Sequence, residues 1–116
     1  MFMEFQFSEK MEGRVVVVEI PKYLSADISE EFKEFLYEIV GKGKHQIVID
    51  LSQAEYVDSS GLGAIVSRLA YCRALNGDIR LAAPSEFMVS LLNITHLDKV
   101  LKVYPDTHSA VSSFAH

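Results

Sequence analysis

The chain has 116 residues, 49% of them hydrophobic and 23% charged, which is enough apolar material for one compact domain over residues 1–116 and too little for two. Its 11 basic and 16 acidic side chains give a formal charge of −5, and no predicted helix carries a Lys/Arg cluster, so neither a nucleic-acid groove nor an anionic membrane surface is an expected partner. No apolar stretch approaches the ~18 residues of a membrane span, and the N-terminus lacks the apolar region of a secretory signal, so a cytoplasmic location is expected.

The N-terminal residues predict a β-hairpin. Phe5 and Phe7 alternate with polar residues, and residues 14–20 (RVVVVEI) predict a second strand that is apolar on both faces. Gly13 marks the turn between them. The first two strands are therefore expected to pair with each other.

The first helix is predicted from a capping pattern and apolar spacing. Asp27 followed by Glu30 has the spacing of a capping box, and Gly41 and Gly43 end the helical pattern. Its apolar residues recur at helical spacing: Ile28, Phe32, Phe35, Leu36, Ile39 and Val40.

Strands and helices then alternate to the C-terminus. The predicted elements are a buried strand at 46–52, a helix that Asn76-Gly77 stops, a strand at 79–83, a helix at 85–94, a strand at 99–104 and a final helix after Pro105-Asp106. The order ββαβαβαβα predicts an α/β sandwich with a mixed central sheet, in which the N-terminal hairpin adds an antiparallel strand to parallel central ones.

The stretch YVDSSGLGAIVSRL, which starts at residue 56, crowds small polar residues before a helix. Right-handed crossovers place such a connection at the carboxyl edge of the sheet, where open α/β folds bind ligands. Asp58 or Ser59 could simply cap the helix while Gly61 and Gly63 let it pack closely. Because one side chain suffices for a cap and Ser60 is also present, the motif suggests a site where a phosphate would be stabilised by the helix N-terminus.

No catalytic, metal or cofactor pattern is complete. A Gly-x-Ser-x-Gly elbow is absent, the dinucleotide pattern that Gly61 and Gly63 would begin has Val66 at its third glycine position, and no P-loop is present. Asp50 lacks the acidic neighbours of a phosphate-receiving aspartate, and Cys72 is expected to be a half-buried small hydrophobe. The ligand count excludes zinc, so we expect a protein that is not an enzyme and has no cofactor or metal.

Residues 47–83, IVIDLSQAEYVDSSGLGAIVSRLAYCRALNGDIRLAA, resemble the central block of STAS domains, specifically of bacterial anti-sigma factor antagonists. In that family a strand ending in Asp-Leu-Ser, here Asp50 to Ser52, is followed by Asp-Ser-Ser-Gly-Leu-Gly, here Asp58 to Gly63, at the start of a helix. The similarity extends from about Arg14 to about Val103.

The resemblance implies a cytosolic switch protein in transcription regulation. In the family the dephosphorylated form binds an anti-sigma factor that is also a serine kinase, and this releases the sigma factor. The kinase turns the antagonist off by phosphorylating the serine after the motif aspartate, here Ser59, and a serine phosphatase restores it.

One loop departs from the family pattern. Where the family usually has Gly-x-Leu-Asp, this chain has Lys22-Tyr-Leu-Ser25, which keeps Leu24. The altered charge of this loop leaves the identity of the partner open. The alternative is a STAS regulatory or structural subunit of another assembly, such as a stress-signalling complex or lipid-transport machinery, without a sigma-factor role.

The expected partner surface combines the motif, the exposed side of its helix and the altered loop. Helical spacing assigns Leu62, Ile65, Val66 and Leu69 to the core. The residues expected at the surface are Asp58, Ser59, Ser60, Gly61, Gly63, Ser67 and Tyr71, with Lys22 and Ser25 from the loop.

Overall fold

The computed structural model describes residues 5–115, which form a mixed α/β fold around a five-stranded sheet of order β1-β2-β4-β6-β7. The strands are β1 (Phe7–Lys10), β2 (Val15–Glu19), β3 (Tyr23–Leu24), β4 (Gln46–Asp50), β5 (Tyr56–Val57), β6 (Asp78–Ala82) and β7 (Val103–Tyr104). The helices are α1 (Ala26–Gly41), α2 (Ser59–Ala74), α3 (Glu86–Ile94), the 3-10 turn η1 (Leu97–Lys99) and α4 (Thr107–Ser112). Strands β2, β4, β6 and β7 are parallel and β1 is antiparallel to β2, which confirms the predicted fold class.

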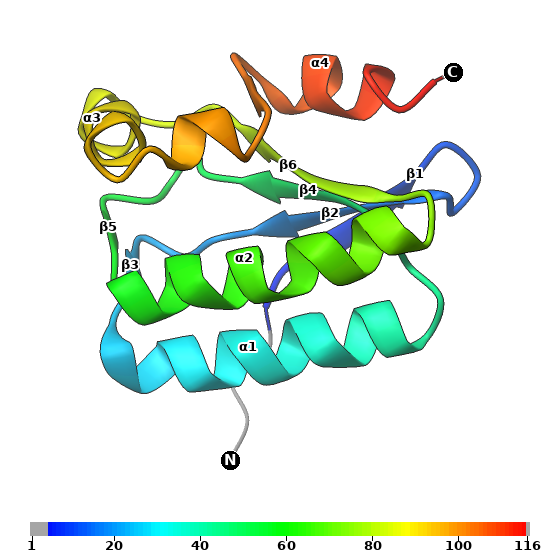
Figure 1. Cartoon of the computed structure of the whole chain (residues 1–116), viewed down its shortest axis with the longest axis horizontal. Helices are drawn as coiled ribbons and strands as arrows, with labels where there is room; N and C mark the ends of the chain where they lie inside the picture. Colours follow the sequence, from blue (N-terminus) through cyan, green and yellow to red (C-terminus); the bar gives the residue numbers. More distant parts are fainter. Residues whose placement is uncertain (1–4, 116) are drawn as a thin grey trace.

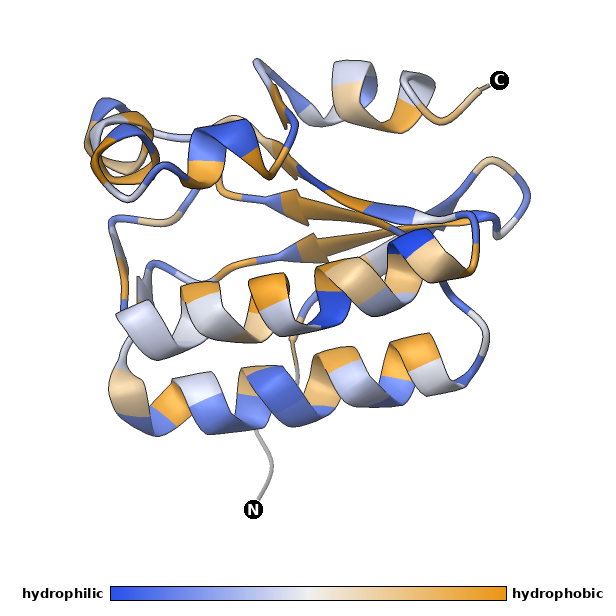
Figure 2. Cartoon of the chain, viewed as in Figure 1, coloured by the Kyte–Doolittle hydropathy of each residue, from blue (hydrophilic) through white to orange (hydrophobic). Residues whose placement is uncertain are grey.

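The elements form three layers (Figure 1). Helices α1 and α2 run side by side in the same direction across one face of the sheet, and α4 lies on the other face. Helix α3 lies at the end of the molecule where α1 and α2 begin. Hydropathy follows these layers, since the strands are mainly hydrophobic and the two long helices carry polar residues among their apolar ones (Figure 2).

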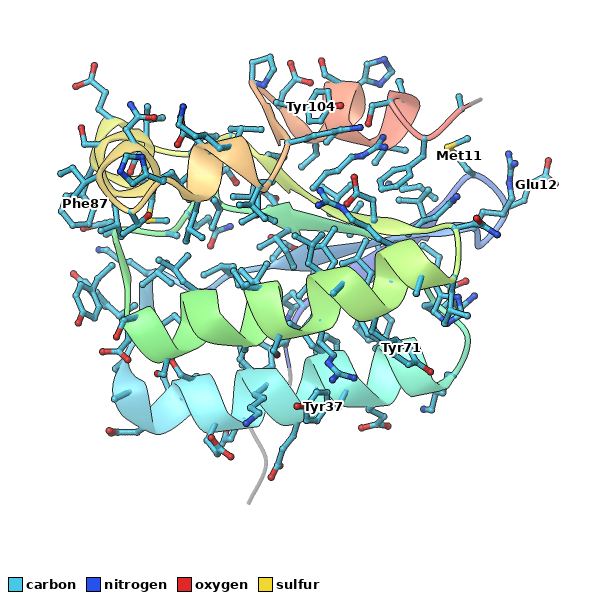
Figure 3. All side chains as sticks on the ribbon, viewed as in Figure 1. Met11, Glu12, Tyr37, Tyr71, Phe87 and Tyr104 are labelled. Carbon is cyan, nitrogen blue, oxygen red and sulfur yellow. The ribbon has the colours of Figure 1, made fainter. Side chains whose placement is uncertain are left out.

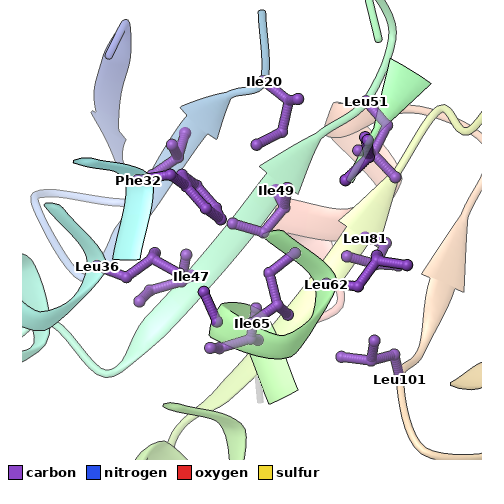
Figure 4. Close-up of a cluster of buried hydrophobic side chains, with 14 of the residues drawn as sticks. Ile20, Phe32, Leu36, Ile47, Ile49, Leu51, Leu62, Ile65, Leu81 and Leu101 are labelled. Atoms are coloured by element: carbon purple, nitrogen blue, oxygen red, sulfur yellow. The ribbon is translucent and has the colours of Figure 1, made fainter. Parts of the chain in front are cut away.

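The sheet is buried on both faces, as the run of valines in β2 predicts. Val16 and Val18 belong to the main core under α1 and α2, whereas Val15 and Val17 belong to a smaller core under α4. Figure 4 shows the main core, where large side chains from α1, β4, α2 and β6 meet; it labels Phe32, Leu36, Ile47, Ile49, Leu62, Ile65 and Leu81. Full burial stabilises the fold by roughly 1.5–3 kcal/mol for each such side chain.

Three local predictions were wrong or incomplete. Helix α1 has its N-cap at Ser25, and Asp27 lies inside the first turn, so the predicted capping box does not form. The strand predicted at 99–104 is reduced to β7, because the chain before it forms η1. The short strands β3 and β5 were not predicted, since two residues are too few to show a period of two.

Gly77 fixes the approach of two strands at the amino edge of the sheet. A Cβ atom at this position would lie 1.9 Å from the backbone oxygen of His45, the residue before β4. The same oxygen accepts a hydrogen bond of 2.9 Å from the amide of Asp78, the first residue of β6. The register of β4 with β6 therefore requires glycine here.

We expect Gly77→Ala to lower the free energy of unfolding by about 3 kcal/mol, because the new methyl group meets rigid backbone and forces β4 and β6 apart. Gly41→Ala is the matched control, since nothing lies within 4 Å of a Cβ atom there. Chemical denaturation of both variants measures the difference. Equal stability of the two would mean that the connection moves freely and does not set the strand register.

Candidate functional site

The motif lies where two short strands bring two helices together. Tyr23 pairs with Tyr56 and Leu24 with Val57 in the parallel ladder of β3 and β5. The ladder continues into the helices, because the amide of Asp58 donates a hydrogen bond of 2.8 Å to the oxygen of Leu24. The N-termini of α1 and α2 consequently lie side by side at the carboxyl edge of the sheet, as expected from the crossovers (Figure 1).

Asp58 is the N-cap of α2 and holds Ser60. Its Oδ2 atom accepts hydrogen bonds from the Ser60 amide at 3.0 Å and from the Ser60 hydroxyl at 2.6 Å, and the Tyr56 hydroxyl donates to Oδ1 at 3.3 Å. These bonds favour the charged carboxylate, so the Ser60 hydroxyl, then the Ser60 amide, lower the pKa of Asp58 below its ordinary value of 3.8.

Ser59 differs from Ser60. It is the first residue of α2 and is exposed, and its hydroxyl makes no hydrogen bond to any of residues 5–115. The exposed helix N-terminus carries partial positive charge, which favours an anion at this position. Of the two adjacent serines, only Ser60 has its hydroxyl engaged by the cap.

The two glycines of the motif have different surroundings. The prediction that Gly61 lies on the exposed side of α2 was wrong: Gly61 is buried, and a Cβ atom there would lie 2.7 Å from Cδ2 of Leu24 and 3.3 Å from Cγ1 of Val57. Gly61 therefore lets α2 pack closely against β3 and β5. Gly63 is exposed, and nothing lies within 4 Å of a Cβ atom there, as a surface position requires.

Ser67 and Tyr71 lie on the exposed side of α2 as predicted, but they continue away from the motif. Because each helical residue rises about 1.5 Å, Tyr71 is about 18 Å from Ser59 along the axis. Tyr71 instead lies near Tyr37 of α1, and Figure 3 shows the two side chains at the middle and far end of the helix pair. The guanidinium of Arg68 lies 3.9 Å from the ring centre of Tyr37 and 5.3 Å from that of Tyr71.

Two core assignments on α2 also change. Val66 is only partly buried. Cys72, expected to be half-buried, is fully buried, and this burial raises the pKa of its thiol. A buried thiol with a raised pKa is a poor nucleophile, which agrees with a packing role.

The altered loop lies beside the motif. Lys22 is exposed and forms an ion pair of 3.3 Å with Glu55, and its backbone oxygen accepts hydrogen bonds from the amides of Glu55 and Tyr56. Ser25 is the N-cap of α1 but makes no side-chain capping hydrogen bond. Both residues thus border the paired helix N-termini, at positions that a partner on this edge could contact.

Sequence reasoning missed exposed aromatic residues at this edge. Tyr23 is 55% exposed and Tyr56 is 45% exposed, and the two are direct neighbours across β3 and β5. Phe87 is 55% exposed on α3, which lies at the same end of the molecule (Figure 3). Such rings are frequent anchors of protein interfaces. Only the position of Tyr56 next to the motif could have suggested this from sequence.

Together, the mixed sheet, the two helices on one face and the polar motif at the start of the second define a small α/β sandwich with a candidate binding edge at paired helix N-termini. The STAS domain family matches residues 7–110, and the chain belongs to this family. None of the helices within residues 5–115 is long and apolar enough to cross a membrane.

Known proteins with the same fold include anti-sigma factor antagonists. A candidate anti-sigma factor antagonist of Thermotoga neapolitana is 32% identical over 106 residues, which cover 90% of this chain and 94% of the relative. The crystal structure of a candidate anti-sigma factor antagonist of Thermotoga maritima superposes with a TM-score of 0.87 at 27% identity, over 97% of this chain and 95% of that one. The phosphorylated form of the Bacillus cell fate determinant SpoIIAA shares the fold, with a TM-score of 0.75, 20% identity and coverage of 96% and 99%.

We expect Asp58→Ala to destabilise the protein at neutral pH and to have little effect in acid. A carboxyl whose pKa is lowered by folding contributes stability above its unfolded pKa, near 3.8, and loses it as the pH falls through the lower folded value. The thermal midpoints of parent and variant, measured from pH 7 downward, should therefore converge below pH 3.8. A gap that stays constant over this range would show that the charge of Asp58 is not what stabilises the cap.

Proposed function

We propose that the chain is an anti-sigma factor antagonist whose unmodified form binds an anti-sigma factor with serine kinase activity and so frees a sigma factor. Phosphorylation of Ser59 by that kinase turns the binding off, and a serine phosphatase restores it. The observation that carries this proposal is the difference between the two serines of the motif. Asp58 accepts a hydrogen bond from the Ser60 hydroxyl, whereas the exposed Ser59 hydroxyl makes no hydrogen bond to any of residues 5–115.

The comparisons support the proposal at the level of the family. The relative from Thermotoga neapolitana and the solved structure from Thermotoga maritima are both candidate anti-sigma factor antagonists. The structure of SpoIIAA has been solved in a phosphorylated form, so a protein with this fold can carry a phosphate and keep its fold. As part of the same proposal, residues 1–116 act as one cytosolic domain that is a kinase substrate and not itself an enzyme.

The physical basis of the switch is local charge. A phosphate on Ser59 adds about −1.5 to −2 charges next to the carboxylate of Asp58. In the free protein water screens this repulsion and the N-terminus of α2 offsets part of it. In a closed interface the screening water is excluded, and about 1.4 kcal/mol of repulsion is already a tenfold loss of affinity. The free protein therefore tolerates a phosphate that the complex rejects.

The partner surface that we propose is centred on the start of α2. Asp58, Ser59, Ser60, Gly63 and Ser67 supply a mainly polar strip, in which Gly63 leaves the backbone open to close approach. The exposed rings of Tyr23 and Tyr56 lie next to this strip and offer the apolar contact area that polar residues lack. Lys22 and Ser25 complete it from the neighbouring loop, and Tyr71 marks its far end.

The decisive experiment combines labelling with binding. Incubated with ATP and the serine kinase of its own cell, the parent protein is expected to gain one adduct of about 80 Da, Ser59→Ala none, and Ser60→Ala most of the parent amount, because Asp58 does not engage the Ser59 hydroxyl. Intact mass spectrometry measures the adduct. The phosphorylated parent is then expected to bind the kinase at least tenfold more weakly than the unmodified protein, by titration calorimetry.

Two outcomes would contradict this assignment. Equal labelling of Ser59→Ala and parent protein would move the modification elsewhere, and unchanged affinity after phosphorylation would remove the switch. If the native kinase gives no adduct at all, the alternative of a STAS regulatory or structural subunit without a sigma-factor role takes its place.

We expect Gly63→Arg to abolish partner binding without unfolding the protein, because the new side chain has open space and projects from the centre of the proposed surface. Ala74→Arg is the matched control, since it adds the same charge at the exposed end of the same helix, about 22 Å from Ser59 along the axis. Titration calorimetry gives the affinities and circular dichroism the thermal transition. If both variants bind like the parent, the partner docks elsewhere.

A further inference from the structure

A second polar feature lies at the opposite edge of the sheet from the motif. A shallow, open depression of about 710 Å³ is lined by the last turn of α2, the start of β6 and the segment from η1 to β7. Arg73 lies about 21 Å from Ser59 along the axis of α2, so this depression is separate from the motif at the start of that helix. Its charged lining consists of Arg73, Arg80, Lys99 and Lys102 with Asp78 and Asp98. This lining is net positive although the whole chain has a formal charge of −5.

The wall of the depression is held by one buried carboxylate. Asp78 is 5% exposed, and its two oxygens accept from Arg73 Nε at 2.8 Å and from Arg80 Nε at 2.9 Å. Arg73 also donates to the backbone oxygen of Val100 at 2.7 Å, and Arg80 donates to the Ser113 hydroxyl at 2.7 Å. Both guanidinium groups are thereby fixed in position before any ligand arrives.

This network leaves unused donors and unneutralised charge. A guanidinium has five N–H groups, and the hydrogen bonds of Arg73 and Arg80 to residues 5–115 use only part of each set. One carboxylate between two guanidinium groups leaves one positive charge in excess. A purely structural role for the network explains the pairing with Asp78, but it gives no reason for further cations around the same depression.

Those further cations lie on the segment from η1 to β7, which forms one side of the depression. Lys99 and Lys102 are exposed and form no ion pair with any of residues 5–115. Leu81 pairs with Val103, so strand alternation places Arg80 and Lys102 as neighbours on the face of the sheet that α4 covers. Asp98 is the opposing charge on the rim, which leaves the cations in the majority.

We propose that this depression binds a small soluble molecule that carries a phosphate or diphosphate group. Arginine N–H groups match the geometry of phosphate oxygens, and lysines add charge that attracts a dianion. The volume lies in the range of small-molecule sites and exceeds what a phosphate group alone would fill. The exposed side chains of Val100 and Val103 supply apolar wall for the organic part of the ligand.

The test is a titration of the full chain with inorganic pyrophosphate, followed by the amide signals in NMR spectra. We expect saturable shifts at Gly77, Asp78 and Lys102. The double variant Lys99→Ala with Lys102→Ala is expected to weaken binding about fivefold or more, since each exposed contact contributes a modest factor. The lysines are chosen because substitution of either arginine would leave the buried Asp78 short of a partner and could unfold the protein.

The control is Lys33→Ala with Lys42→Ala, which removes the same charge from the α1 side of the molecule and is expected to change the affinity less than twofold. Parallel titrations with adenosine monophosphate and with inorganic phosphate test the organic part: tighter binding of adenosine monophosphate supports contact with the apolar wall. The proposal is overturned by the absence of saturable shifts, by shifts confined to the start of α2, or by equal weakening in the two double variants. Because this site does not involve Ser59, its failure would leave the proposed switch untouched.

Discussion

The parallel pairing of β3 with β5 is the contact on which the functional edge depends. It is only two residues long, yet the hydrogen bond from the Asp58 amide to the Leu24 oxygen carries it into the helices and fixes where α1 and α2 begin. Gly61 makes this closeness possible, because any side chain there would meet Leu24. Without the pairing, the motif would be a flexible connection after β4, and its serines would have no defined orientation.

The N-cap of α2 determines which of the two serine hydroxyls is free of hydrogen bonds to residues 5–115. A carboxylate that accepts both the amide and the hydroxyl of Ser60 does what a helix N-terminus requires, and it removes one of two chemically identical groups from competition. Ser59 remains at the N-terminus of α2, where partial positive charge favours an anion. In the proposed switch, the same residue, Asp58, supplies the like charge that would make a phosphate costly in an interface. The proposed regulation would thus use the same carboxylate that caps the helix.

The two edges of the sheet have different chemistry because they are built by different ends of the same elements. The carboxyl edge carries helix N-termini, an acidic cap and exposed tyrosines, which suit a protein surface. The amino edge carries the end of α2 and the start of β6, where Asp78 holds Arg73 and Arg80 around a depression. The length of α2 keeps the two features about 20 Å apart, so each can have its own ligand.

The sequence by itself determined the long elements, the burial of both sheet faces and the family, because valine runs, helical spacing and the Asp-Ser-Ser-Gly-Leu-Gly hexapeptide are local patterns. It also located the start of α2 and both serines. Tertiary structure alone decided the rest. Gly61 is buried because Leu24 of β3 lies against it, and Ser25 rather than Asp27 is the N-cap of α1. Arg73 at the end of α2 donates to the backbone oxygen of Val100, a residue 27 positions further along the chain. Such outcomes depend on contacts between segments far apart in the chain, which no local pattern encodes.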